Sequence, residues 1–143
     1  MITHVLVPLD GSDASEEALA PAAELAERFG AKLSLMTVML RFPESRIHVP
    51  KMDEHSVASG QSYLADVVAR QALGAGISTE AVLGTPAEAI IEFARGHGVD
   101  LIVMSTHGTT GSDRTQNGLG SVAWKLLHNA PCAIYLVPIR PVG

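Results

Sequence analysis

A run of small and hydroxyl-bearing residues carries the most recognisable chemistry in this sequence. Residues 103–131, VMSTHGTTGSDRTQNGLGSVAWKLLHNAP, place four glycines between an aliphatic run and an amphipathic segment. Glycine lets a backbone approach phosphate oxygens closely, and the N–H groups at the start of a helix attract anions. Gly120 and Ser121 stand where such a helix would begin, so the stretch predicts a phosphate site. The alternative is an ordinary polar loop in which Ser121 caps the helix.

Other motifs fit the same stretch less well. GLGSVA, residues 118–123, matches the G-x-G-x-x-A pattern of dinucleotide-binding proteins. However, it follows a long loop instead of a strand, and too little chain remains after it for a ribose-binding acid. There is no G-x-x-x-x-G-K-[ST] loop and no G-x-S-x-G elbow. The six histidines show no metal-ligand spacing, and only His107 lies in the candidate site, where its imidazole could donate to a phosphate.

Composition excludes several classes of partner. The chain has 143 residues and a formal charge of −5, with aromatics at only 4%, so we expect no nucleic-acid partner. No apolar run approaches the roughly 20 residues that span a bilayer, so we expect no membrane association and a cytoplasmic location. Cys132 is the single cysteine, which excludes an internal disulfide, and we interpret it as a buried small apolar residue.

Aliphatic runs alternate with amphipathic segments along the chain. The runs predict strands over residues 3–10, 32–40, 99–105 and 132–138, and the alternating pattern of residues 77–84 predicts another. A first helix follows the first strand, with Asp13 and Glu16 as a capping box and Gly30 as its end. Residues 42–53 are predicted as a surface loop and residues 63–74 as helical. A third helix starts with Thr85 as N-cap and Pro86 in the first position, and a fourth covers residues 121–129.

This alternation predicts an α/β fold, with residues 1–143 as a single domain around a parallel sheet covered by helices on both faces. In such open sheets, ligands bind beyond the carboxyl ends of the strands, where the strand order reverses. The loops PLDGS after the first strand and STHGTTG…GLGS after the fourth therefore form the candidate site.

Three stretches, in this order, resemble the universal stress protein family over nearly the whole chain. VLVPLDGSDASEEAL is similar to its first strand and turn, GTPAEAII to the start of its third helix, and DLIVMSTHG…GSVAWKLLHNAPCAIYLVP to its nucleotide-loop end. The resemblance implies a Rossmann-like open sheet of five parallel strands in the order 3-2-1-4-5. It also implies a homodimer, and either ATP or AMP as ligand or no nucleotide at all.

The family's nucleotide binders carry a loop of the form G-x2-G-x9-G-[ST], and this sequence departs from it twice. Ser105 stands where the first glycine belongs, and eleven residues separate Gly108 from Gly120 instead of nine. In the longer middle part, Arg114 could meet a phosphate, whereas Asp113 would repel one.

The resemblance implies one set of binding residues. Leu9, Asp10 and Val38 would lie near adenine and ribose, and the phosphates would lie against residues 104–108 and 120–122; the full set is Pro8, Leu9, Asp10, Val38, Met104, Ser105, His107, Gly108, Gly120, Ser121 and Val122. Mg²⁺ would accompany a triphosphate. Asp10 could instead be only a turn residue that caps the first helix.

The expected function is therefore a stress-related binding protein that holds ATP or AMP at the crevice between the first and fourth strands, with a regulatory or protective role and no catalytic residues. Two alternatives stay open: a dimeric interaction module of the same fold without nucleotide, and a slow ATP hydrolase.

The implied strand order places CAIYLVPI, residues 132–139, at an open sheet edge without Lys or Glu to protect it. Pairing with a second copy would cover that edge and bury Ile134, Tyr135 and Leu136.

Overall fold

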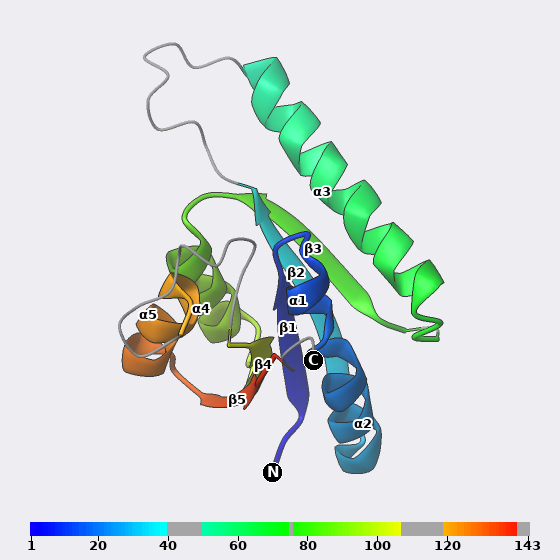
Figure 1. The fold of residues 1–143 in the computed structure, drawn as a ribbon, viewed down its shortest axis with the longest axis vertical. Coiled ribbons are helices and arrows are strands. Elements are labelled where there is room, and N and C mark those ends of the chain that lie inside the picture. Colours follow the sequence, from blue (N-terminus) through cyan, green and yellow to red (C-terminus); the bar gives the residue numbers. More distant parts are fainter. Residues whose placement is uncertain (40–49, 75, 107–118, 140–143) are drawn as a thin grey trace.

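The computed structural model describes residues 1–39, 50–74, 76–106 and 119–139, without the side chains of residues 50–56. Five parallel strands form one sheet in the order β3-β2-β1-β4-β5 (Figure 1), as the family resemblance implied. The strands are β1 (His4–Leu9), β2 (Lys32–Met39), β3 (Ser78–Leu83), β4 (Leu101–Ser105) and β5 (Ala133–Val137). Each predicted strand is therefore present, with ends that shift by one or two residues.

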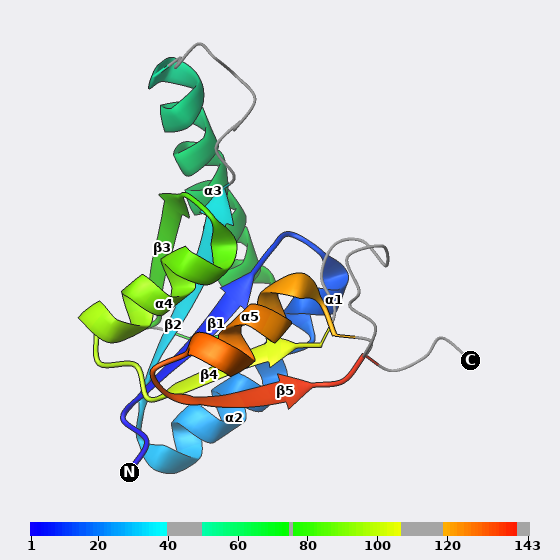
Figure 2. The same cartoon turned by 90° about the vertical axis from the view of Figure 1, so that its left-hand side faces the viewer.

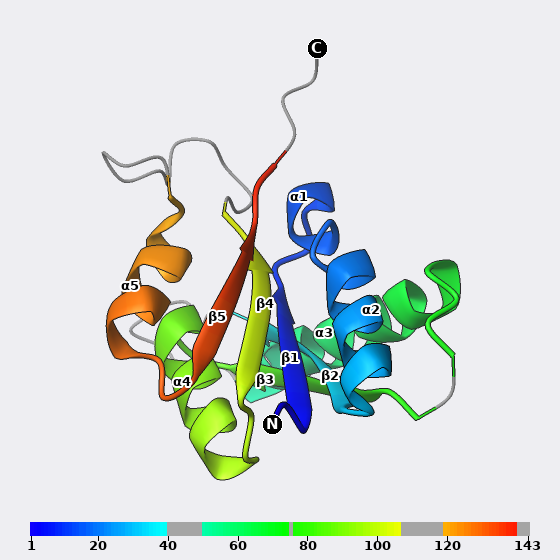
Figure 3. The same cartoon turned by 90° about the horizontal axis from the view of Figure 1, so that it is seen from below.

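Helices cover both faces of this sheet, as predicted. Seen from below in Figure 3, α4 (Pro86–Gly96) and α5 (Ser121–Asn129) lie on one face, and α1 (Asp13–Glu16), α2 (Leu19–Phe29) and α3 (Pro50–Arg70) lie on the other. Figure 2, turned by a quarter, shows α4 and α5 side by side in front of the sheet. None of the helices in the described part of the chain is both long enough and apolar enough to cross a membrane.

Two apolar clusters, one on each face, hold the layers together. On β1, Val5 and Val7 point into the cluster under α2 and α3, while Leu6 between them points into the cluster under α4 and α5. All three side chains are fully buried. Because both faces of the sheet are covered, the central strands are mainly aliphatic and show no regular polar alternation.

The first helix differs from its prediction, because it is two helices. Pro21 lies in the first turn of α2, where it has no N–H to bond to Glu17, four residues earlier, so a single helix cannot run through this point. The predicted capping box of Asp13 and Glu16 is also wrong. Ser12 is the N-cap, and its hydroxyl accepts a hydrogen bond of 3.1 Å from the Ser15 N–H.

The side chain of Glu16 points away from the cap and joins α1 to α3. Its carboxylate accepts a hydrogen bond of 3.1 Å from the Tyr63 hydroxyl and lies 3.1 Å from the Arg70 guanidinium. Burial, together with the nearby Glu16 carboxylate, raises the pKa of Tyr63 to about 12. The carboxylate that the sequence assigned to helix capping therefore docks one helix onto another.

Helix α3 begins earlier than predicted and lies very close to the sheet. Pro50 to Asp53 belong to the helix, because proline is accepted in a first helical position; the rest of the predicted loop lies outside the described residues. Gly60 permits the close approach, since a Cβ there would lie 3.0 Å from Ala81 Cβ, 3.1 Å from Thr37 Cγ2 and 3.2 Å from Met39 Sδ.

A histidine that the sequence did not single out lies at the amino-terminal end of β1, where it joins neighbouring parts of the chain by hydrogen bonds. His4 is buried, with Nε2 at 2.7 Å from Ser34 Oγ and Nδ1 at 3.0 Å from the His97 carbonyl oxygen. Next to it, the Asp100 carboxylate accepts hydrogen bonds from the backbone of Thr3 and His4. Cys132, predicted to be buried, is half-buried, and burial raises the pKa of its thiol.

Candidate functional site

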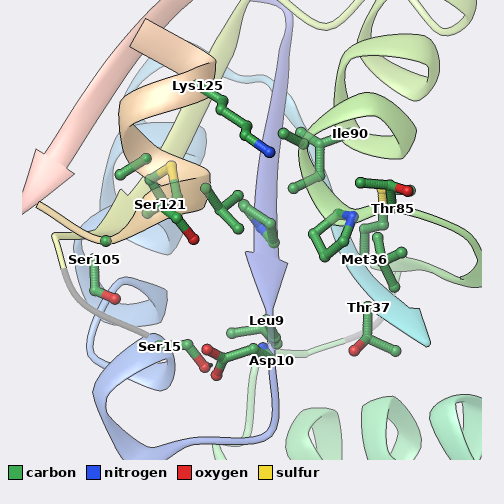
Figure 4. Close-up of a pocket in the computed structure, with 18 of the residues that line it drawn as sticks. Leu9, Asp10, Ser15, Met36, Thr37, Thr85, Ile90, Ser105, Ser121 and Lys125 are labelled. Atoms are coloured by element: carbon green, nitrogen blue, oxygen red, sulfur yellow. Dashed lines mark hydrogen bonds between the residues drawn. The ribbon is translucent and has the colours of Figure 1, made fainter. Parts of the chain in front are cut away.

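A pocket of about 520 Å³ opens at the carboxyl ends of β1, β2 and β4, between α4 and α5 (Figure 4). In the sheet, β1 pairs with β2 on one side and with β4 on the other, so the chain order reverses here. This is the position at which open α/β sheets bind ligands. The volume lies within the range of roughly 300–1,000 Å³ typical of small-molecule sites.

The pocket brings together nine of the residues that the sequence singled out: Pro8, Leu9, Asp10, Val38, Met104, Ser105, Gly120, Ser121 and Val122. The other two, His107 and Gly108, lie outside the described residues, as do Asp113 and Arg114. Residues from four separate segments of the chain thus line one cavity, as the positions of the strand ends predicted.

Thr106, within the expected phosphate segment 104–108, also lines the pocket. Other lining residues were missed from the sequence: Ser15, Met36, Thr37, Met39, Thr85, Pro86, Ala87, Ile90, Ala123 and Lys125. Those of α4 could have been found, because the predicted third helix starts just after a strand whose carboxyl end lies on the same edge. Lys125 could have been found too, since it follows Ser121 by four residues and therefore lies on the same face of α5.

Asp10 provides the carboxylate of the pocket, and the turn after β1 orients it. Its Oδ1 atom accepts hydrogen bonds from the Ser12 backbone N–H, at 2.9 Å, and from the Ser12 hydroxyl. Among the described residues, no donor reaches Oδ2. Asp10 therefore does support the turn after β1, as the alternative interpretation of Asp10 as a turn residue predicted. It is Ser12, however, that caps the helix, and one carboxylate oxygen of Asp10 remains open to a ligand.

The start of α5 provides the positive end of the pocket. Gly120 is the N-cap, so Ser121 does not cap the helix as the polar-loop alternative required, and its hydroxyl points into the pocket in Figure 4. The first N–H groups of a helix have no partner within it, and here they belong to Ser121, Val122 and Ala123, which line the pocket. Together with the helix dipole, they favour an anion.

Apolar side chains form the remaining wall. Leu9 and Met36 come from the central strands, and Ile90 faces them from α4; all three are buried in the surrounding core. Val38 and Pro86 extend this surface toward the pocket mouth. Such a surface suits a flat ring system, with polar groups of the ligand directed to Asp10 and to α5.

Comparisons with known proteins agree on one family. The model described as the universal stress protein family matches residues 1–138. A universal stress protein of Methanocaldococcus jannaschii is 36% identical over 140 residues, which cover 93% of this chain and 80% of that protein.

Solved structures give the same result. The universal stress protein UspA from Lactobacillus plantarum matches with a TM-score of 0.74 and 28% identity, covering 97% of this chain and 98% of that one. A universal stress protein solved in complex with cAMP matches with a TM-score of 0.72 and 26% identity, covering 95% and 97% of the two chains.

Proposed function

Because this chain belongs to the universal stress protein family, we propose that it binds an adenine nucleotide, ATP or AMP, in the pocket between β1 and β4 and acts as a regulatory or protective protein in the cytoplasm under stress. One observation carries the proposal. A single pocket joins an apolar wall, the partly free carboxylate of Asp10 and the N-terminus of α5. The cAMP bound by the related structure supports the same class of ligand.

Each part of the nucleotide finds suitable chemistry in the pocket. The adenine ring would lie against the apolar wall near Leu9 and Val38. Asp10 Oδ2 would accept a hydrogen bond from a ribose hydroxyl, because a hydroxyl group can donate to a carboxylate. A phosphate could not take this position, since the negative charge of the carboxylate would repel it. The α-phosphate would lie at the first turn of α5, with the Ser121 hydroxyl as a further donor.

A triphosphate would bring Mg²⁺ with it. Mg²⁺ keeps several waters and is usually held by phosphate oxygens with one or two protein ligands. No three His, Cys, Asp or Glu side chains come together as a metal cluster in the described part of the chain. We therefore expect the ion to be held chiefly by the phosphates, with the Ser121 hydroxyl within the same end of the pocket.

The proposed role is binding and not catalysis. Asp10 is the only carboxylate among the described lining residues, and its Oδ1 atom is already engaged by Ser12.

The proposed assembly is a homodimer through β5. That strand lies at the sheet edge, and Tyr135 on it is 47% exposed. Pairing with a second copy would satisfy the open N–H and C=O groups of the edge.

Mass spectrometry of the ligand released by denaturing the purified protein, followed by thermal unfolding with AMP and with ATP, tests the nucleotide proposal. A ligand at 100 times its dissociation constant stabilises the fold by about 2.7 kcal/mol, or roughly 5–10 °C for a chain of this size. Guanosine nucleotides serve as the control. If no nucleotide is released and neither AMP nor ATP shifts the transition, the interaction-module alternative replaces this proposal; phosphate release from ATP above background would favour the hydrolase.

A further inference from the structure

Lys125 is the only cationic side chain among the described residues that line the pocket. It reaches from α5 toward Ile90 on α4, while Asp10 lies at the other end of the pocket (Figure 4). The ion pairs formed by the described residues involve Arg28 and Arg70, and none of them includes Lys125. The pocket therefore contains a positive charge for which the described part of the chain supplies no counter-ion.

The position of Lys125 on α5 explains what this charge can meet. Ser121 and Lys125 are four residues apart, so they lie on one face of the helix, one turn from each other. Side chains on a helix lean toward its N-terminus. The ammonium group and the N–H groups of the first turn therefore act on the same side of the pocket, and both attract negative charge.

The pocket is consequently polarised along its length. Asp10 makes one end negative, whereas Lys125 and the start of α5 make the other end positive. A ligand that follows this polarity has hydroxyl donors at one end and anionic oxygens at the other. Apolar residues such as Ile90 and Met36 also line the pocket, while Asp10 and Lys125 are both exposed.

We propose that Lys125 is the specificity-determining residue that makes this pocket select phosphorylated adenine nucleotides over adenosine, with a preference that grows with the number of phosphate charges. The inference rests on the proposed function, because it assigns the phosphate end of the same site. A nucleoside leaves Lys125 without a counter-ion in the pocket. A phosphate supplies that counter-ion and forms a charge-assisted hydrogen bond.

The test compares adenosine, AMP, ADP and ATP by calorimetric titration at constant ionic strength, with EDTA present so that no metal masks the phosphate charge. The variant is Lys125→Met, which keeps the length of the side chain and removes its charge. Lys32→Met is the matched control, because it changes the net charge of the protein by the same amount. Lys32 is exposed at the amino-terminal end of β2, whereas the pocket lies at the carboxyl ends of the strands. Lys125→Arg tests rescue by another cation.

We expect Lys125→Met to weaken AMP by about tenfold and ADP and ATP by larger factors, as loss of a charge-assisted bond predicts. Adenosine should bind equally to all variants. Lys125→Arg and Lys32→Met should keep the wild-type preference for phosphorylated ligands. The ratio of the adenosine and AMP affinities is the decisive quantity, since general damage to the pocket would weaken both ligands together.

Two results would overturn the inference and leave the proposed function intact: equal weakening of adenosine and AMP in Lys125→Met, or unchanged affinities for all four ligands. If wild-type protein binds none of the four, the proposed function fails, and the inference fails with it. The wild-type titration therefore separates the two cases.

Discussion

The backbone N–H of Gly120 donates a hydrogen bond of 2.7 Å to the carbonyl oxygen of Thr106. The N–H of Thr106 in turn bonds to the Val137 carbonyl oxygen at 3.0 Å, which continues the pairing of β4 with β5. The chain therefore leaves β4 and returns to α5 at one fixed point.

This hydrogen bond changes how the longer glycine loop is interpreted. The sequence has eleven residues between Gly108 and Gly120, where the binders of the family pattern have nine. The pocket nevertheless receives Ser105 from one end of the segment and Ser121 from the other. Both ends of the longer segment are therefore in place for the proposed phosphate site at the start of α5.

We predict that Gly120→Glu abolishes nucleotide binding in a folded protein. A carboxylate at the start of α5 would take the place of the phosphate at the helix N-terminus and repel any phosphate that approached. Gly120→Gln is the matched control, because it adds a side chain of nearly the same size without the charge. Titration of AMP and circular dichroism would check binding and fold. Equal affinities of the Glu and Gln variants would contradict a role for charge at this position.

We predict that Ser105→Gly strengthens nucleotide binding. Ser105 is the last residue of β4, it is buried, and it lines the pocket. Glycine would remove the Cβ from the wall and let the ligand approach the backbone more closely. The fold itself should lose about 0.5–1 kcal/mol of stability, the usual cost of glycine in a strand.

Ser105→Ala separates the two contributions of this side chain, because it removes the hydroxyl and keeps the Cβ. Weaker binding of AMP by both the Ala and the Gly variant would show that the serine hydroxyl contacts the ligand, which is the opposite of the prediction.

Tyr63 should make the protein less stable as the pH rises from 10 to 12. The pKa of this phenol is raised to about 12 by burial and by the Glu16 carboxylate, so the native state keeps a proton that the unfolded chain releases near pH 10. The contribution of Tyr63 to stability is complete below pH 10 and is lost as the pH rises toward 12. Urea unfolding of wild type and Tyr63→Phe at several pH values in this range would measure the difference.

The titration itself can be followed directly, because the chain has only two tyrosines. In a Tyr135→Phe variant, the tyrosinate absorbance reports Tyr63 alone. An ordinary pKa near 10 in that variant would show that the Glu16 carboxylate does not hold the phenol in solution.

We predict a homodimer in which β5 meets its copy, and its disruption by Tyr135→Lys. Ile134 and Leu136 are partly buried against the cluster under α4 and α5, so a lysine at either position would damage the monomer as well. Tyr135 lies between them and is 47% exposed, so a lysine there leaves that cluster untouched and places like charges opposite each other across the interface. Light scattering should find a dimer for wild type and a monomer for the variant; a dimer in both would place the interface on another surface.

The order of elements was predictable because four strands are largely aliphatic runs bounded by turn residues, and β3 shows the alternation of a strand. The periodicity of the sequence could not show that one predicted helix is two. The division results from Pro21. This residue has no N–H that could donate to the carbonyl oxygen of Glu17, which a continuous helix would place within hydrogen-bond distance. The start of α3 was missed for a related reason. Proline interrupts a helix at most positions but is accepted in its first turn, and Pro50 is the first residue of α3.

The glycine loop and the resemblance together singled out nine of the residues that meet at the candidate pocket. The contributions of α4 and of Lys125 were missed because each needs a second step of inference: placing the helix after β3 at the same end of the sheet as the other strand ends, and extending the face of α5 by one turn from Ser121. Glu16 shows the same limit. Its spacing from Asp13 suits a capping box, yet Tyr63 and Arg70, far along the chain, determine where its carboxylate points.

Thr37 and Met39 line the pocket and are also the side chains that Gly60 of α3 approaches within contact distance. The pocket and the helix are thus separated on this side by a single layer of side chains, which both of them use. A bulkier ligand cannot gain space there unless α3 lifts away from β2 and β3, and a larger residue at Gly60 would push the same two side chains inward.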